Sequence, residues 1–165
     1  MKRLNQEELN LCRIQARIFE ASLKETMSSP IFIRRFMNSE VAKRMDQGGF
    51  FLEASSMDSI FCELEEEYGK SNYGKIKYAE DELYWIGYMY RYWAVAAGWS
   101  SKKIYRIIGA KDMKLRYYPL HTMDPERAIE EIMEDKEISM NSEERNLEIM
   151  RRLILEKMNK KKVGI

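Results

Sequence analysis

The chain has 165 residues, of which 45% are hydrophobic and 33% are charged, so it is long enough to bury a core and has the composition of a globular protein. Its 28 basic and 27 acidic residues give a net charge of +1. Bulk charge therefore argues neither for nor against nucleic acid, and only local patches are informative. The opening MKRLNQEELN lacks the apolar run of a secretory signal.

The first two predicted helices follow from apolar spacing and capping signals. A helix from Gln6 to Met27 is predicted because its apolar residues recur at helical spacing. Ser28-Ser29-Pro30 then signals the start of a second helix, which we expect to reach Met45 and to end at Gly48-Gly49. The inward residues predicted for the two helices are Leu9, Cys12, Ala16, Phe19 and Leu23, then Ile33, Phe36, Met37, Val41 and Met45.

The next stretch combines an undecided connector, a helix and a loop. Residues 50–53 fit an extended connector or a short edge strand equally well. Ser55 with Asp58 resembles a capping box, which predicts a helix to about Tyr68 with one acidic face. Residues 69–77, GKSNYGKIK, are the most loop-like part of the chain; they lack the spacing of a phosphate-binding loop, which favours a surface turn.

The central helix is predicted from about Ala79 to Ala97. Residues 78–99 hold all three tryptophans and five of the ten tyrosines, and Arg91 is their only charge after the opening acidic cluster. A helix that is apolar on every side is packed all round. Because Arg91 interrupts the apolar run and the run falls short of about 20 residues, we reject a membrane span.

The rest of the chain is predicted as short helices. Ser100 or Ser101 starts one that runs to Ile108, and a helical turn follows near Lys111 to Tyr117. Tyr118-Pro119 predicts extended backbone. Asp124-Pro125 starts another helix, and Ser142 caps the last one. The inward residues predicted for these two are Ala128, Ile129, Ile132 and Met133, then Leu147, Met150, Leu153, Ile154 and Met158.

Together these elements predict an all-α protein, a single compact multi-helix domain over residues 1–158 around a buried aromatic-rich central helix. Residues 159–165 would form a basic, flexible tail. The two cysteines, Cys12 and Cys62, lie at apolar-phase positions without metal-like spacing. They are therefore expected to be reduced core thiols of a cytoplasmic protein.

One pair of helices has the spacing of a helix-turn-helix motif. Ala94, Gly98 and Ile104 match its small, turn and anchoring positions, with Ile107 as the next inward residue. The second helix would then expose Lys102, Lys103 and Arg106 as DNA-binding candidates. From Gly98 to Tyr118 there are six bases and one acid, which supplies a local positive patch. An ordinary helical corner explains the same spacing.

Several polar and aromatic residues near the only histidine are candidates for a partner or ligand site. They are Lys75, Tyr78, Tyr117, Tyr118 and His121. A histidine between tyrosines and an acid can act as a general base. However, Asp124 is better explained as a helix cap, and no nucleophile is tied to His121 by spacing, so no catalytic residue is assigned. A single histidine excludes a His-rich metal site, and no metal or cofactor motif is present.

Charge is segregated along the second half of the chain. Residues 124–144 contain nine acids and two bases, whereas residues 151–162 contain six bases and one acid. Charge runs are usually solvated helix faces. Complementary charge also permits self-association into a homo-oligomer, or docking to another protein.

Three runs resemble a family of small bacterial proteins of unknown function: SSPIFIRRFMNSEVAKRMD, EEYGKSNYGKIKYAEDELYWIGYMYRYW and SSKKIYRIIGAKDMKLRYYPLHTMDPERAIEEIME. The resemblance covers roughly residues 28–134. It implies antitoxin-like proteins encoded beside ADP-ribosyltransferase-type toxins, and hence a partner protein and autoregulation of the operon. It supplies no catalytic residues for this chain.

Three functions are therefore weighed. The leading interpretation is a non-enzymatic antitoxin-like protein that binds and neutralises a cognate protein toxin. The second is a helix-turn-helix DNA-binding regulator. The third is an enzyme or toxin component that uses the region of Tyr117, His121 and Lys75.

Overall fold

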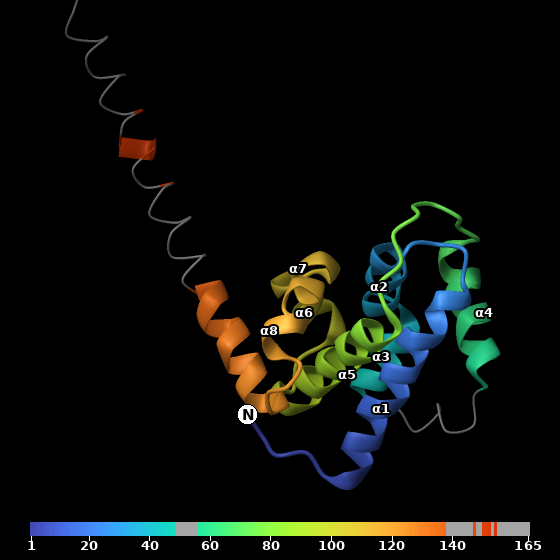
Figure 1. Cartoon of the computed structure of the whole chain (residues 1–165), viewed down its shortest axis with the longest axis horizontal. Coiled ribbons are helices and arrows are strands. Elements are labelled where there is room, and N and C mark those ends of the chain that lie inside the picture. Colours follow the sequence, from blue (N-terminus) through green and yellow to red (C-terminus); the bar gives the residue numbers. More distant parts are fainter. Residues whose placement is uncertain (49–55, 138–146, 148–149, 153, 155–165) are drawn as a thin grey trace, which may run out of the picture. The chain divides into compact units, whose positions relative to one another are not determined.

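A computed structural model of the chain describes residues 1–48, 56–137, 147, 150–152 and 154. All regular structure in these residues is helical (Figure 1), which confirms the predicted all-α class. The chain divides into two units, Met1–Ile129 and Glu130–Ile165. A single domain over residues 1–158 stays a prediction, and the expected tail at 159–165 lies outside the described residues.

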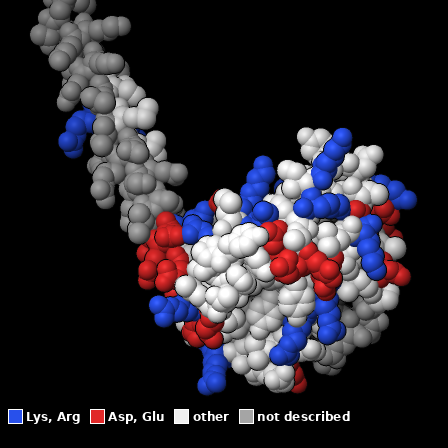
Figure 2. All heavy atoms as spheres, viewed as in Figure 1, with Lys and Arg blue, Asp and Glu red and all other residues white. Residues whose placement is uncertain are grey.

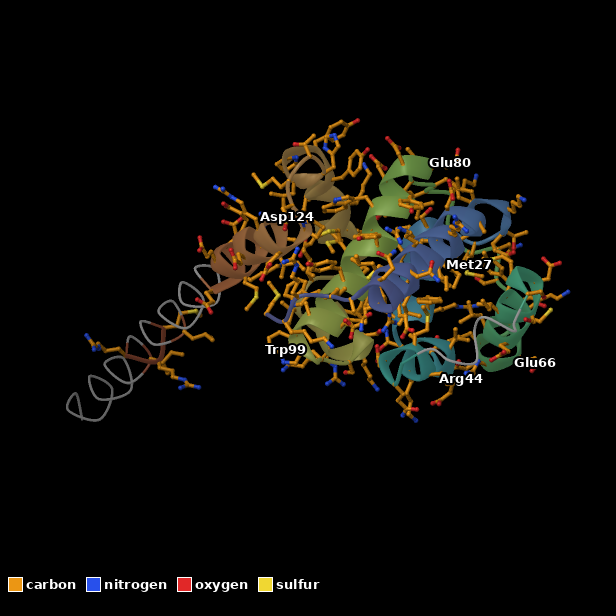
Figure 3. All side chains as sticks on the ribbon, turned by 90° about the horizontal axis from the view of Figure 1, so that it is seen from below. Met27, Arg44, Glu66, Glu80, Trp99 and Asp124 are labelled. Atoms are coloured by element: carbon orange, nitrogen blue, oxygen red, sulfur yellow. The ribbon has the colours of Figure 1, made fainter. Side chains whose placement is uncertain are left out.

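The core of Met1–Ile129 is built on two helices, α1 (Gln6–Ala21) and α5 (Glu80–Ala97), which lie side by side and run antiparallel (Figures 1 and 3). The backbone N–H of Lys2 donates to the carbonyl of Ala96 over 3.0 Å, and the Gln15 side chain donates to the carbonyl of Gly87, also over 3.0 Å. A Cβ at Gly87 would lie 2.8 Å from Cγ of Phe19. Gly87 is therefore what allows the two backbones to approach.

The central helix α5 is covered on all sides, as its sequence predicts. No residue from Glu82 to Ala97 is exposed, and Tyr90, Arg91 and Trp93 are fully buried. The helix begins where the Glu82 side chain accepts a hydrogen bond from the backbone N–H of Ala79. It ends at Gly98, whose φ of +64° lies in the left-handed region that favours glycine.

Two of the predicted helix lengths are wrong. The α1 helix stops at Ala21 and a 3₁₀ turn, η1 (Ser22–Lys24), follows, so the helix does not reach Met27. The helix expected to reach Met45 is two helices, α2 (Ser29–Met37) and α3 (Glu40–Asp46). Ser39 causes the break, because its hydroxyl donates to the carbonyl of Phe36 and accepts from the N–H of Ala42.

The helix α4 (Met57–Tyr68) is capped by Ser56, with Ile60 and Leu64 buried. Cys62 is exposed on its outer face, so the prediction of two core thiols holds for Cys12 and is wrong for Cys62. The predicted connector at 50–53 and the capping residue Ser55 lie outside the described residues.

Three short helices follow α5: α6 (Ser101–Ile107), α7 (Ala110–Leu115) and α8 (Tyr117–Leu120). Ser100 caps α6 by accepting from the N–H of Lys103. The expectation of extended backbone at Tyr118-Pro119 is wrong, because both residues lie in α8. Proline is tolerated there since a first helical turn has no use for its missing N–H.

A further helix begins after Asp124, whose carboxylate accepts from the N–H of Glu126, as predicted. It continues to residue 137, with Ala128, Ile129 and Ile132 buried. In Glu130–Ile165, the predicted burial of Leu147, Met150 and Ile154 is wrong, since each is more than half exposed. Their spacing of three and then four residues marks an exposed apolar stripe within Glu130–Ile165. Ser142, Leu153 and Met158 lie outside the described residues.

Candidate functional site

In Met1–Ile129, the aromatic rings at α8 form a cluster that is attached to the first turns of α5. Asp81 and Trp85 lie one turn apart on α5, and Tyr117 and His121 one turn apart at α8. The Tyr117 hydroxyl donates to Oδ2 of Asp81 over 2.8 Å. The Tyr117 ring meets Trp85 edge-to-face at 5.7 Å and stacks on His121 at 4.6 Å. Tyr117 is therefore held on three sides.

Two backbone carbonyls lie within hydrogen-bond distance of the His121 ring. Its Nδ1 lies 3.0 Å from the carbonyl oxygen of Tyr117 and 3.1 Å from that of Tyr118. A carbonyl oxygen accepts, so Nδ1 can donate to either carbonyl in the form of the ring that carries a hydrogen on Nδ1. Among the described residues, no serine or cysteine is hydrogen-bonded to His121.

The electrostatics of this cluster keep Tyr117 in its phenol form. The hydrogen bond to Asp81 raises the pKa of Tyr117 above its ordinary value and holds the pKa of the Asp81 carboxyl below its own. A tyrosine that acts as a general base needs a lowered pKa. The arrangement is thus suited to holding a ring in place and is poorly suited to proton abstraction.

Beside the fixed rings, large side chains project into solvent. Tyr118 is 76% exposed and meets Tyr117 edge-to-face at 5.5 Å, and Leu115 is 71% exposed at the end of α7. We call Trp85, Leu115, Tyr117, Tyr118 and His121 the aromatic surface. Tyrosine and tryptophan are enriched at protein interfaces, where they supply large contact area with little loss of rotamer freedom.

The other two partner candidates are placed elsewhere. Tyr78 is only 5% exposed, beneath Lys114, whose ammonium lies 5.6 Å from the ring centre and 3.7 Å from Oε1 of Glu82. Lys75 is exposed in the loop at 69–77. The structure therefore brings Tyr117, Tyr118 and His121 together and leaves Lys75 and Tyr78 outside the aromatic surface.

The loop at 69–77 is fastened to the start of α2. The carbonyls of Tyr73 and Ile76 accept from the N–H groups of Ser28 and Ser29. The Lys77 ammonium donates to the carbonyls of Glu25 and Met27, each over 2.6 Å. These bonds satisfy two of the backbone N–H groups at the start of α2, those of Ser28 and Ser29. The loop is a surface turn, as its sequence favours, and its structural role is to cap a helix.

The predicted helix-turn-helix positions have the expected burial in part. Ala94 and Ile104 are buried, whereas Ile108 is buried in place of Ile107, which is half-buried. Lys102, Lys103 and Arg106 are all exposed on the seven-residue helix α6. The Lys103 ammonium lies 3.6 Å from the ring centre of Trp99, which leaves Lys102 and Arg106 as the cations that project freely.

Sequence reasoning missed a buried polar network around Arg91. This guanidinium donates to Asp46 over 2.7 Å, to Gln15 over 2.8 Å and to Ser101 over 3.0 Å. The network joins α1, α3, α5 and α6. The sequence held one signal of this network, a single arginine inside an otherwise apolar helix. Because a buried charge is costly unless it is paired, such an arginine predicts a buried carboxylate beside it. Asp46 also lines a cavity of about 670 Å³ between the N-terminal segment and the ends of α3 and α5.

Comparison of the chain with known protein families, with curated proteins and with solved structures finds no match in any of the three. Within the described residues, no three His, Cys, Asp or Glu side chains are grouped as metal ligands would be. Likewise, none of the helices in the described ranges is long and apolar enough to cross a membrane.

Proposed function

We propose that this chain is a non-enzymatic, antitoxin-like protein that binds a cognate protein toxin and neutralises it, with autoregulation of its operon as a further role. The observation that carries the proposal is the aromatic surface, where Asp81 and Trp85 hold the Tyr117 ring in place. The exposed side chains of Leu115 and Tyr118 lie two residues before and one residue after Tyr117 in the chain. Fixed rings lose little entropy on binding, which favours affinity.

A binding role fits the chemistry of the cluster better than the enzymatic alternative does. The raised pKa of Tyr117 keeps its hydroxyl protonated, and this hydroxyl donates its hydrogen bond to Asp81. The carbonyls of Tyr117 and Tyr118 lie beside Nδ1 of His121 and hold its ring in one orientation. The hydrogen bonds of both side chains thus fix the rings of the aromatic surface in place.

The second unit offers a further contact of a known kind. Leu147, Met150 and Ile154 follow one helical face at three- and four-residue spacing, and all three are exposed. A helix that presents an apolar stripe can lie in a groove of a partner protein. This supports the proposal that a toxin is bound by more than one part of the chain.

The test is co-expression with the product of the neighbouring gene, which the family resemblance names as the toxin. We expect that product alone to arrest growth, and this chain to restore growth and to co-purify with it at fixed stoichiometry. Leu115→Ala/Tyr118→Ala should weaken the complex by about 10- to 100-fold, as the loss of interface anchors does. Growth arrest that this chain does not relieve would reject the antitoxin-like role.

The loop at 69–77 supplies a matched control. Tyr73 is 75% exposed and Ile76 is also exposed, so Tyr73→Ala/Ile76→Ala removes the same kinds of side chain from another surface. The complex should keep its affinity in this variant. Equal weakening by both double variants would show that the aromatic surface has no special part in binding.

A second candidate function is DNA binding by α6. The observation that favours it is the exposure of Lys102, Lys103 and Arg106 directly after the left-handed turn at Gly98. On the face that Figure 2 shows, Lys and Arg side chains are interspersed with Asp and Glu. Alanine at all three positions should abolish salt-sensitive binding to duplex DNA. Unchanged binding in this triple variant would reject α6 as the DNA-binding helix.

A further inference from the structure

A second cavity in Met1–Ile129 is lined by basic side chains and by the ring of a tyrosine. This cavity of about 370 Å³ lies between α2, α6 and α7. Arg34 comes from α2, Tyr105 from α6 and Lys111 from α7, and Asp112 is the one carboxylate among the lining residues. Neither Arg34 nor Lys111 forms an ion pair with any other described residue.

Further basic residues lie on α6, next to the tyrosine that lines the cavity. Lys102, Tyr105 and Arg106 lie three and four residues apart, which places them on one side of the helix. Lys102 and Arg106 are exposed and, like Arg34 and Lys111, have no carboxylate partner in the described part of the chain. Three helices thus contribute four cations that form no ion pair with a described residue, and Asp112 is the one acid among the residues that line the cavity.

Tyr105 gives this region its aromatic component. Burial raises the pKa of Tyr105, while the N–H of Ala110 and the charge of Arg34 act in the opposite direction. The ring therefore lies within the field of the cavity's arginine. Free cations beside an aromatic wall are what proteins use to hold a nucleic-acid backbone while a base stacks.

We propose that Arg34, Lys102, Arg106 and Lys111 bind the phosphates of a single strand of nucleic acid, with one nucleotide in the cavity against Tyr105. The proposal rests on the cationic α6 of the second candidate function, and adds α2 and α7 to it. Phosphate contacts carry no sequence information, so binding is independent of sequence. A cavity admits an unpaired nucleotide, whereas a paired base inside a duplex cannot enter it.

The test is fluorescence anisotropy of the full chain with a labelled mixed-sequence 20-nucleotide DNA and with its duplex, at several salt concentrations. We expect the single strand to bind more tightly. Arg34→Ala/Lys111→Ala should weaken its binding by about 10-fold and make the slope of log K against log salt shallower by about 1.4, because two phosphate contacts are lost. Arg17→Ala/Lys24→Ala, which removes two exposed cations from α1 and η1, should change neither quantity.

Each failure has a distinct meaning. If Lys102→Ala/Arg106→Ala weakens binding and Arg34→Ala/Lys111→Ala does not, the cavity surface is rejected and DNA binding by α6 stands. If the duplex binds more tightly than the single strand, the strand assignment is overturned. If the chain binds neither DNA, both nucleic-acid proposals fail, and the toxin-binding proposal is unaffected.

Discussion

Arg91 and Asp46 form an ion pair inside the protein, with the guanidinium fully buried and Nη1 2.7 Å from Oδ1 of Asp46. The same carboxylate accepts from the N–H and the hydroxyl of Ser101 over 2.9 and 2.6 Å. One carboxylate at the end of α3 thereby ties the central helix to the start of α6.

The first prediction concerns this pair. Arg91→Met should lower the free energy of unfolding by roughly 3–5 kcal/mol, because it leaves the Asp46 carboxylate without its charge partner. Chemical denaturation followed by circular dichroism measures the change. Arg44→Met is the matched control, since Arg44 pairs with Glu63 on the surface and should cost less than about 1 kcal/mol. Similar losses in both variants would contradict the special role of the buried pair.

A second prediction tests the contact between α1 and α5. In Gly87→Ala the new Cβ would lie 2.8 Å from Cγ of Phe19 and 2.9 Å from the carbonyl oxygen of Gln15. Because backbone cannot easily move aside, we expect a loss of roughly 1–3 kcal/mol. Gly109→Ala, where no atom lies within 4 Å, should lose less than about 1 kcal/mol by the same thermal or chemical denaturation. An unchanged midpoint for Gly87→Ala would refute the close approach.

The two cysteines should differ sharply in reactivity. Burial raises the pKa of Cys12 to about 12, so at pH 8 only roughly one Cys12 in 10,000 is thiolate, the reactive form. Cys62 is exposed. A thiol-reactive dye should therefore label one site quickly in the native protein and two after unfolding. Cys62→Ser should remove the fast reaction, and a fast site that persists in this variant would contradict the burial of Cys12.

The ring cluster predicts a measurable titration. Tyr117→Phe removes the hydrogen bond that lowers the pKa of Asp81, so this pKa should rise towards its ordinary value. Because the pKa of Asp81 is depressed in the folded state, its contribution to stability is present above the unfolded-state pKa and lost as pH falls through the folded-state pKa. Carboxyl NMR titration measures the shift. Tyr118→Phe serves as the control and should leave the Asp81 titration unchanged.

Capping residues and apolar spacing predicted most of the helices of this fold. Most of what they did not predict depends on contacts between residues that are far apart along the chain. The composition of residues 78–99 and the turn at Gly98 predict α5 almost to the residue. A helix that is buried on every side needs apolar residues throughout, and a left-handed cap favours glycine, so both features can be recognised in the sequence. The break at Ser39 was missed because a serine inside an apolar pattern can either continue a helix or cap a new one. Which occurs is decided by the packing of α3.

The candidate site was predictable in its members and not in its geometry. Tyr117, Tyr118 and His121 are neighbours in sequence and in the structure. Asp81, which fixes Tyr117, lies 36 positions away along the chain, and no local pattern announces that hydrogen bond. The same holds for Arg91 and Asp46, which are separated by 45 positions.

The fastening of the loop at 69–77 has a consequence for how the chain can vary. Gly74, with φ of +79°, already leaves no room for a Cβ, which would lie 2.7 Å from Oγ of Ser28. Adding or removing one residue would shift the carbonyls of Tyr73 and Ile76 away from the two amides that they cap. This exposed connection should therefore keep its length in related chains while its outward side chains diversify, the reverse of what an exposed loop ordinarily does.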